Sequence, residues 1–427
     1  MEKDYLTNRT HHISPKQTNN DYITTPIIIL VLLSGVYFFR IAFFSLNIIY
    51  ILQFATIGLL VLIILFQNIY WKFNLNKHHF TWPVVFIFTG MFLSMLTAEY
   101  AHNQPIVISL WAQRFLYFYL FYFVLHIFQP SVKTLENIII YAGIAYILAF
   151  LLQYIAFPRV IFDVRQEIDR GTIRIFLPGL LILYTAYFIC LTRVLFFNSF
   201  KYIFFIIPAI GIIILSGTRS VIAPPVIVTF LVLVFSKKIK SRALIIILIF
   251  AAIGMAYYMF QDIIENLLAI SQTQSETYEE NVRISAAKFY LSDFYPNDLA
   301  YITGNGQGHQ ASPYGRAIQS YKTNLGYYQS DIGIIGEYTK YGAFFIFGVF
   351  AILFKGIGQK LNINVKYVHY TLILILLSIP LGMFFTSSGG IVIVCIMMYI
   401  LDTKRNRRKQ TDKKARPIVY FPELENK

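Results

Sequence analysis

The sequence predicts an all-α polytopic membrane protein with about twelve transmembrane helices and one large outer loop that contains short amphipathic helices. Two observations support this prediction. The chain of 427 residues is 57% hydrophobic and only 13% charged, whereas about a quarter of the residues in soluble domains are charged. Its apolar residues also gather into runs of about 17–25, the length that crosses a bilayer as a helix.

Twelve apolar runs divide the chain. They cover residues 26–46, 48–70, 82–98, 106–127, 135–157, 176–193, 201–216, 220–236, 243–260, 331–354, 367–385 and 388–403. The expected organisation is a cytoplasmic tail (1–25), a transmembrane domain (26–403) with a large extracytoplasmic loop (261–330), and a basic cytoplasmic tail (404–427). A polar segment precedes the first run and no small-residue cleavage site follows it, so a span is expected there instead of a cleaved signal.

The distribution of lysine and arginine predicts the orientation, because short loops rich in these residues stay in the cytoplasm. With both termini cytoplasmic, seventeen lysines and seven arginines fall inside, and three lysines and nine arginines fall outside. Most acidic residues lie outside, which leaves the outer side almost neutral. The net charge of +15 therefore indicates membrane orientation and does not indicate a nucleic-acid partner.

The cations predicted on the outer side are mainly arginines. A guanidinium group binds phosphate or carboxylate through two parallel hydrogen bonds and tolerates partial desolvation. Arg219, in the segment SGTRSVIAPP, has no acidic residue near it in the sequence, and we interpret it as a binding residue. Arg170 could instead pair with Asp169 beside it. The nine outer arginines are Arg40, Arg114, Arg159, Arg165, Arg170, Arg174, Arg219, Arg283 and Arg316.

The large outer loop contains two notable segments. NVRISAAKFYL has apolar residues at helical spacing, which predicts an amphipathic helix. GNGQGH lacks the spacing and the strand–helix context of a nucleotide-binding fingerprint. Its glycines could form tight turns or let backbone N–H groups approach a ligand. His309 ends this turn and could be catalytic or simply solvated.

Acidic residues mark the start of the tenth predicted span. Asp331 opens it and could cap the helix, serve a site, or do both. Glu337 and Lys340 lie three residues apart on one helix face, and an internal ion pair is the simplest account of them. The outer side has no HExxH or DxD motif and no clustered Asp/His pair, and Cys190 and Cys395 lie inside predicted spans. Chemistry without a metal or another cofactor is therefore expected.

From about residue 26 to 403 the chain resembles the O-antigen polymerase and O-antigen ligase superfamily of bacterial membrane glycosyltransferases. The resemblance rests on SGTRS at a span end, on RGTIRIFLPG in the preceding outer loop, and on a large loop with Arg283, GNGQGH and a polar pair before GIIGEYTKYG. Ligases of the superfamily show a His–Asn-like pair eleven residues before the closing glycine. Counted back from Gly342, that position is Asp331, which favours the polymerase branch.

The resemblance implies glycan transfer between undecaprenyl-diphosphate-linked oligosaccharides on the outer face of the bacterial cytoplasmic membrane. The product would be O-antigen, capsule or exopolysaccharide, with a flippase and a chain-length regulator as partners. Prepositioned arginines would stabilise the diphosphate leaving group, and Asp331, favoured slightly over His309, would accept the proton of the acceptor hydroxyl. The residues of the expected diphosphate clamp are Arg219, Arg283, Arg170, Arg174 and Arg316.

Two alternative functions stay open. A ligase would use the same chemistry but would pass the glycan to a different acceptor. A flippase for lipid-linked oligosaccharides would also suit twelve spans with internal cations. Transporters of this size often contain two homologous halves, but the sequence has no visible repeat, and its long loop on one side only argues against a flippase.

The predicted orientation can be tested by labelling single cysteines in intact cells. A cysteine at Ser275 should react with an impermeant thiol reagent, once any outer membrane is permeabilised, because the loop that holds it is predicted to be outside. A cysteine at Ser241, in the segment KKIKSR, should not react. The opposite labelling pattern would overturn the assignment of every outer residue discussed above.

Overall fold

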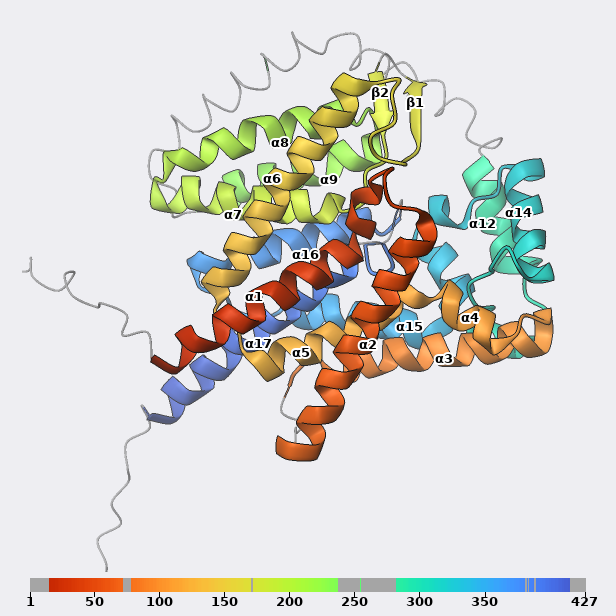
Figure 1. Cartoon of the computed structure of the whole chain (residues 1–427), viewed down its shortest axis with the longest axis horizontal. Coiled ribbons are helices and arrows are strands. Elements are labelled where there is room, and N and C mark those ends of the chain that lie inside the picture. Colours follow the sequence, from red (N-terminus) through yellow and green to blue (C-terminus); the bar gives the residue numbers. More distant parts are fainter. Residues whose placement is uncertain are drawn as a thin grey trace, which may run out of the picture.

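A computed structural model describes residues 15–71, 78–169, 172–236, 254, 282–380, 382, 384–387 and 389–414. This part of the chain is predominantly helical (Figure 1). The elements of the first half are α1 (Pro15–Gly35), η1 (Tyr37–Arg40), α2 (Leu46–Trp71), α3 (Thr81–His102), α4 (Ile106–Ala112), η3 (Arg114–Tyr119), α5 (Leu120–Phe128), α6 (Val132–Ala156), β1 (Gln166–Asp169), β2 (Thr172–Ile175), α7 (Leu180–Phe197), η4 (Phe200–Tyr202), α8 (Ile203–Leu215) and α9 (Arg219–Phe235). Those of the second half are α12 (Val282–Ser292), α13 (Asp298–Thr303), α14 (Pro313–Leu325), η6 (Gln329–Ile332), α15 (Ile334–Ile357), η7 (Ile363–Val365), α16 (Tyr367–Ser378) and α17 (Gly390–Lys414).

Five of the described helices are long and apolar enough to cross a membrane. They are the apolar parts of α2, α3, α6, α7 and α15, and a sixth span results if α4 and η3–α5, which meet at a bend of 64°, count as one. The chain is therefore compatible with a membrane protein. The predicted run at 243–260 lies outside the described residues except for Gly254. Helices occur in the other predicted runs, but several are short, so the number of twelve spans stays a prediction.

Two predicted span boundaries were wrong, for local reasons. The first helix starts earlier than expected and ends at Gly35, after which residues 37–40 all have positive φ. The run predicted at 367–385 is helical only to Ser378, and Pro380, which has no backbone N–H to donate, does not continue the helix. Among the described residues, β1 and β2 also form a small antiparallel strand pair.

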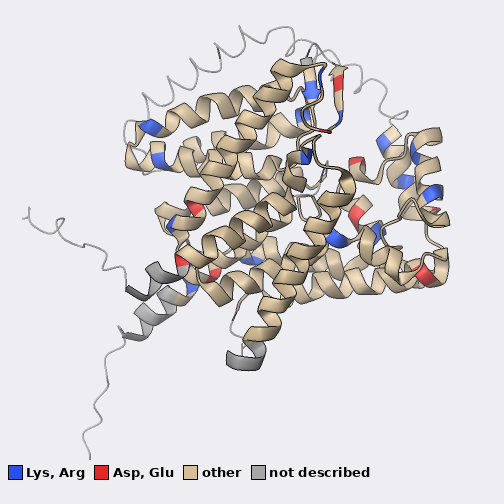
Figure 2. Ribbon diagram, viewed as in Figure 1, with Lys and Arg blue, Asp and Glu red and all other residues tan. Residues whose placement is uncertain are grey.

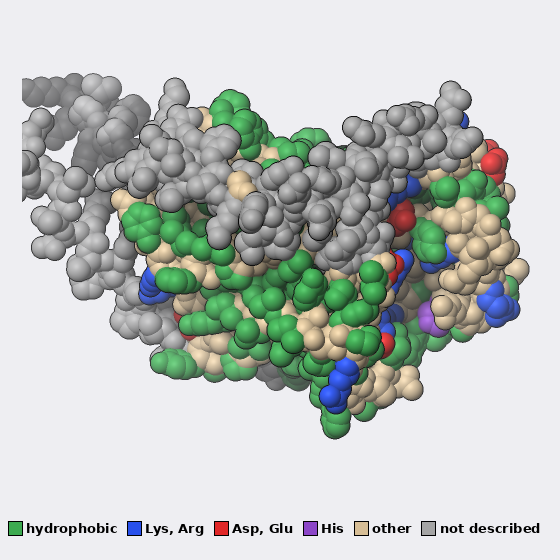
Figure 3. Space-filling model, turned by 90° about the horizontal axis from the view of Figure 1, so that it is seen from above, with side chains coloured by type: hydrophobic (Ala, Val, Ile, Leu, Met, Phe, Trp, Pro, Cys, Tyr) green, Lys and Arg blue, Asp and Glu red, His purple; other side chains and the backbone are tan. Residues whose placement is uncertain are grey.

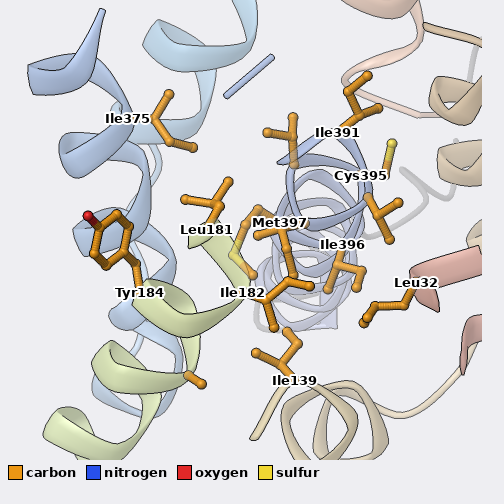
Figure 4. Close-up of a cluster of buried hydrophobic side chains, with 14 of the residues drawn as sticks. Leu32, Ile139, Leu181, Ile182, Tyr184, Ile375, Ile391, Cys395, Ile396 and Met397 are labelled. Carbon is orange, nitrogen blue, oxygen red and sulfur yellow. The ribbon is translucent and has the colours of Figure 1, made fainter. Parts of the chain in front are cut away.

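The core of the helical body surrounds α17. The apolar part of this helix is buried on all sides, which is typical of a central helix. Figure 4 shows Ile396 and Met397 of α17 among side chains from the surrounding helices. The labelled neighbours are Leu32 of α1, Ile139 of α6, Leu181, Ile182 and Tyr184 of α7, and Ile375 of α16. Segments from both ends of the sequence therefore build one core.

A smaller lobe of α12, α13 and α14 is attached to one end of this body (Figure 1). The predicted amphipathic helix is present as α12, with Ala286 and Tyr290 buried. These residues pack in a second apolar cluster, which is separate from the main core and also contains Phe294, Tyr314 and Ile318. In Figure 1 the beginning of α1 and the end of α17 lie together at the left, and the lobe lies at the right.

α3 and α15 pack closely against each other along α3. A Cβ atom added at Gly90 of α3 would lie 2.6 Å from the backbone nitrogen of Phe345 and 2.9 Å from the carbonyl oxygen of Tyr341. One at Gly348 of α15 would lie 2.7 Å from the carbonyl oxygen of Pro83. The two helices run antiparallel, and each glycine lets the backbone of the other helix approach.

This packing predicts that Gly90→Ala destabilises the protein by about 1–3 kcal/mol, the usual cost of overpacking a core. Gly58→Ala is the matched control, because Gly58 also lies within a helix and nothing lies within 4 Å of the position that its Cβ atom would take. Thermal unfolding in detergent should show a lower midpoint for the first variant and an unchanged or higher midpoint for the second. Equal midpoints would mean that α3 and α15 can separate at no cost.

Candidate functional site

A pocket of about 450 Å³ opens near the end of the body that carries the lobe. We call it the Arg114 pocket. Its lining residues are Tyr37, Tyr50, Ala112, Gln113, Arg114, Phe115, Leu116, Gln307, Gly308, His309, Gln310, Glu337, Lys340, Tyr341 and Thr386. In the space-filling view, basic, acidic and histidine side chains gather in a hollow between the body and the lobe (Figure 3). Segments distant in the sequence therefore contribute charged groups to one place.

A break in α15 anchors the glycine-rich turn beside the pocket. Gly342 has a φ of 72°, which only glycine adopts readily, and the carbonyl groups before it are turned out of the helix. The N–H of Asn305 donates to the Thr339 oxygen at 2.8 Å, and the N–H of Gly306 donates to the Lys340 oxygen at 2.7 Å. The glycines of GNGQGH thus allow the backbone of the turn to pack closely against the backbone of α15.

The buried side chain of Gln104 fixes the rest of the turn. Its Nε2 donates to the Gln307 carbonyl oxygen at 2.9 Å. Its Oε1 accepts from the His309 N–H at 3.0 Å and from the Ser312 hydroxyl at 2.6 Å. Because one amide uses both its donor and its acceptor atoms on this turn, the position of His309 relative to α3 is set by three hydrogen bonds.

The predicted ion pair between Glu337 and Lys340 is present. Lys340 Nζ lies 3.0 Å from Glu337 Oε1, and both side chains are buried, with exposed fractions of 11% and 7%. The other carboxylate oxygen, Oε2, is buried and has no hydrogen-bond partner within the described structure. Since buried carboxylate oxygens are normally bonded, Oε2 is available to accept a hydrogen bond from a ligand in the pocket.

Arg114 supplies a second cation to the pocket. Its Nε donates to Gln53 Oε1 at 3.1 Å, and its guanidinium carbon lies 4.3 Å from the centre of the Tyr50 ring. Gln53 is fully buried and is itself held by the Ser34 carbonyl oxygen. Within the described residues no carboxylate pairs with Arg114. A rigidly held guanidinium without a counter-ion is well suited to bind an anion.

The hydrogen bonds of His309 restrict what its ring can do. Nδ1 accepts a hydrogen bond from the N–H of Ala311 at 3.2 Å. In the neutral ring the proton must then reside on Nε2, because one nitrogen donates when the other accepts. The free edge of the ring is therefore a hydrogen-bond donor, which suits a phosphate or sugar oxygen better than it suits proton abstraction.

Charges from the lobe also reach this region. Burial lowers the pKa of Lys322 on α14, the positive charge of Lys340 lowers it further, and Asp331 opposes both effects. Figure 2 shows basic residues on the lobe and on the facing part of the body. A ligand that bridges the two would therefore meet basic groups together with the carboxylates of Glu337 and Asp331.

The structure places the other predicted site residues away from the pocket lining. Arg174 on β2 pairs with Glu167 at 2.7 Å and donates to the Thr218 hydroxyl at 2.8 Å. This brings Arg174 beside the SGTRS turn, where Arg219 begins α9. Arg174 thus already has an acidic partner, as is expected of an arginine with a purely structural role.

The remaining candidates lie on the lobe or outside the described residues. Arg283 on α12 and Arg316 on α14 are exposed, and neither lines the Arg114 pocket. Arg170 falls outside the described residues. Among the predicted site residues that the structure describes, His309 is the one that lines the Arg114 pocket.

Of the two roles left open for Asp331, that of the helix cap is not realised. Asp331 belongs to the short 3-10 helix η6, and Gly333 occupies the N-cap position of α15. Its exposed carboxylate accepts a hydrogen bond from the Ser330 hydroxyl at 3.1 Å. The charge of Asp331 acts on Lys322, but Asp331 is not among the residues that line the pocket.

Sequence reasoning missed Arg114 as a site residue, although a signal was present. Arg114 lies within an apolar run with no acidic neighbour, which is the same criterion that singled out Arg219. Glu337 and Lys340 were identified only as an ion pair. That they line a pocket depends on the break at Gly342, which periodicity alone does not reveal.

Comparison with known proteins found no matching family model, no matching curated protein and no matching solved structure.

The buried ion pair predicts a specific pattern of stabilities. Lys340→Met should destabilise the protein by about 3–5 kcal/mol, because it leaves the Glu337 carboxylate buried without its partner. The double variant Glu337→Gln with Lys340→Met should be more stable than Lys340→Met alone, since both charges are then removed. Unfolding in detergent would measure the difference, with the exposed Lys288→Met as the control. Strict additivity of the two substitutions would contradict a coupled pair.

Proposed function

We propose that the protein is a glycosyltransferase that polymerises undecaprenyl-diphosphate-linked oligosaccharide repeat units into surface polysaccharide. The reaction would take place on the outer face of the bacterial cytoplasmic membrane. The observation that supports this most directly is the Arg114 pocket, which combines two cations, a carboxylate with an unbonded oxygen and an imidazole donor. The sequence resemblance to the O-antigen polymerases and ligases supplies the class of substrate.

The position of the pocket agrees with the predicted orientation. Its residues come mainly from η1, the start of α2, the bend between α4 and η3, the glycine-rich turn and the first turns of α15. The charge bias of the loops assigns all of these helix ends to the outer side. A lipid-linked sugar presented at the outer face would therefore reach the pocket at the level of its phosphates.

The two cations suit the diphosphate of the lipid-linked donor. Arg114 offers a planar pair of N–H groups, and Lys340 contributes a point charge beside it. As the glycosidic bond breaks, the negative charge on the diphosphate grows. Groups that are already fixed in place stabilise this charge without reorganisation, which is a large effect in catalysis. Gln53 and Tyr50 hold Arg114 in such a fixed position.

The remaining polar groups of the pocket suit the acceptor hydroxyl that attacks and the donor oxygens beside the breaking bond. The hydroxyl oxygen of the acceptor sugar attacks the anomeric carbon of the donor, and the bond from that carbon to the diphosphate oxygen breaks. The lipid diphosphate leaves with the bonding electron pair. The hydroxyl proton passes to Glu337, whose Oε2 is free to receive it, while the Nε2–H of His309 donates to a phosphate or sugar oxygen. General-base assistance of this kind contributes about 10²–10⁴-fold to a rate.

The lipid tail has an apolar surface available beside the pocket. The helix α2 begins near Tyr50 and carries exposed apolar side chains along its length, among them Ile51, Leu62 and Phe66. A polyprenyl chain could lie along such a face in the bilayer while its diphosphate enters the pocket. The predicted clamp residues Arg219, Arg174, Arg170, Arg283 and Arg316 are then candidates to bind the growing glycan or the acceptor's diphosphate.

The proposal predicts that Arg114→Lys and Glu337→Gln each reduce polymer formation by about 10²-fold or more, although Arg114→Lys keeps the positive charge. The reason is that the ammonium group lacks the bidentate geometry, and the amide cannot accept the proton. Long polysaccharide chains would be measured on gels from cells that lack the native gene and carry each variant. Arg159→Lys, at an exposed outer arginine, is the matched control for Arg114→Lys.

This comparison of polymer formation requires equal amounts of each variant protein in the membrane. Loss in Asp331→Asn together with full activity in Glu337→Gln would assign the base to Asp331. Loss in Arg219→Lys with normal chains from Arg114→Lys would place the clamp at the SGTRS turn. With purified protein and lipid-linked repeat units as the sole substrate, a polymerase forms long chains, whereas a ligase needs a separate acceptor.

A further inference from the structure

A buried cluster of three metal-ligating side chains lies at the end of α3 opposite to the Arg114 pocket. His78 precedes α3, His126 lies near the end of α5, and Asp402 lies on α17. One ligand atom from each residue lies within 4.8 Å of the other two. His126 and Asp402 are almost fully buried, with side-chain exposures of 6% and 2%. Three segments that are far apart in the sequence thus meet in one small polar site.

One pair of ligand atoms already has a spacing that fits a metal ion. His126 Nε2 lies 3.2 Å from Asp402 Oδ2. Donors at about 2.0–2.1 Å from a tetrahedral zinc ion are about 3.3 Å apart. Within the described residues His126 Nε2 takes part in no hydrogen bond of acceptable geometry. A cation between these two atoms would account for their approach.

The two histidine rings lie side by side at this site. The ring centres of His78 and His126 are 3.8 Å apart, and imidazole nitrogens are common metal ligands. Two imidazole nitrogens and one carboxylate oxygen, with a water in the fourth position, form a donor set that zinc commonly takes.

Outer interactions hold the carboxylate in place. The Tyr122 hydroxyl donates to Asp402 Oδ2 at 2.6 Å, and the backbone N–H of His79 donates to the same carboxylate at 3.2 Å. The ammonium group of Lys355 lies nearby and donates to the His79 carbonyl oxygen at 3.3 Å. Partners that orient a ligating carboxylate in this way are typical of built metal sites.

We propose that His78, His126 and Asp402 bind a divalent cation of the zinc type, with a water molecule as the fourth ligand. The ion would join α3, α5 and α17 at the end of the body away from the Arg114 pocket. It would have no part in glycosyl transfer, and the proposal does not depend on the proposed function. The alternative is a direct contact between His126 and Asp402 with no metal ion at the site.

Metal binding to the purified full-length chain tests this proposal. The protein would be prepared without a polyhistidine tag, stripped with a chelator and titrated with Zn²⁺ by calorimetry, and its metal content would be measured by mass spectrometry. One zinc ion per chain is expected to bind. His126→Ala and Asp402→Asn should each weaken binding by at least about 100-fold, and Tyr122→Phe, which removes an outer partner, by about 10-fold.

Two controls separate this site from adventitious binding by histidine. The double variant His11→Ala with His12→Ala removes the adjacent histidines of the N-terminal segment, and His369→Ala removes a half-buried histidine of α16. Both should bind zinc like the parent chain. Absence of binding at about 100 µM Zn²⁺, loss of binding in the His11/His12 variant, or unchanged binding in His126→Ala and Asp402→Asn would each overturn the proposal.

A readout on the unmodified chain covers the case in which the ligand variants do not fold. Zn²⁺ should raise the melting temperature of the parent protein, because a ligand that binds only the folded state stabilises it. Mg²⁺, which prefers six oxygen ligands, should have no such effect. Co²⁺ should give the intense visible absorption of a four-coordinate site. The weak spectrum of a six-coordinate ion would contradict the proposal.

Discussion

The local structure of the candidate site depends on the break in α15 at Gly342. A continuous helix would use the Thr339 and Lys340 carbonyl groups internally, and the glycine-rich turn would have no acceptor to bind. The break leaves both carbonyl oxygens without a partner inside the helix, and the backbone N–H groups of Asn305 and Gly306 donate to them. A Cβ atom at Gly342 would lie 2.3 Å from the Ile302 carbonyl oxygen, so no other residue fits. These two hydrogen bonds, together with those of Gln104, position His309 relative to the charged first turns of α15.

The sequence predicted those features that depend on local pattern. Apolar runs identified the helices, and the spacing of three residues identified the ion pair of Glu337 with Lys340. Features that depend on tertiary contacts were not predicted. The cap role considered for Asp331 is not realised, because the chain enters α15 through η6 and Gly333, and neither leaves a periodic signal. The cluster of His78, His126 and Asp402 could not be recognised, because its members are separated by tens to hundreds of residues.

The arginines illustrate why composition identifies candidates but not sites. Arg114, Arg174 and Arg219 each lie within or at the edge of an apolar stretch of the sequence. In the folded chain Arg174 is neutralised by Glu167 across the β1–β2 strand pair. Arg114 instead rests against Tyr50 and Gln53, which orient the guanidinium group and leave its charge in place. Strand register and helix packing decide whether an arginine meets an acidic partner, and neither can be read directly from the sequence.

The polar groups of the Arg114 pocket carry a cost for folding that a ligand could offset. Glu337 and Lys340 compensate each other, but the structure provides Arg114 with no carboxylate in the part of the chain that it describes. A partly desolvated cation and an unbonded carboxylate oxygen both reduce stability. Local departures of this kind from good packing are common where a protein must bind something. An anionic ligand that also carries hydroxyl groups, as a sugar diphosphate does, would satisfy both groups at once.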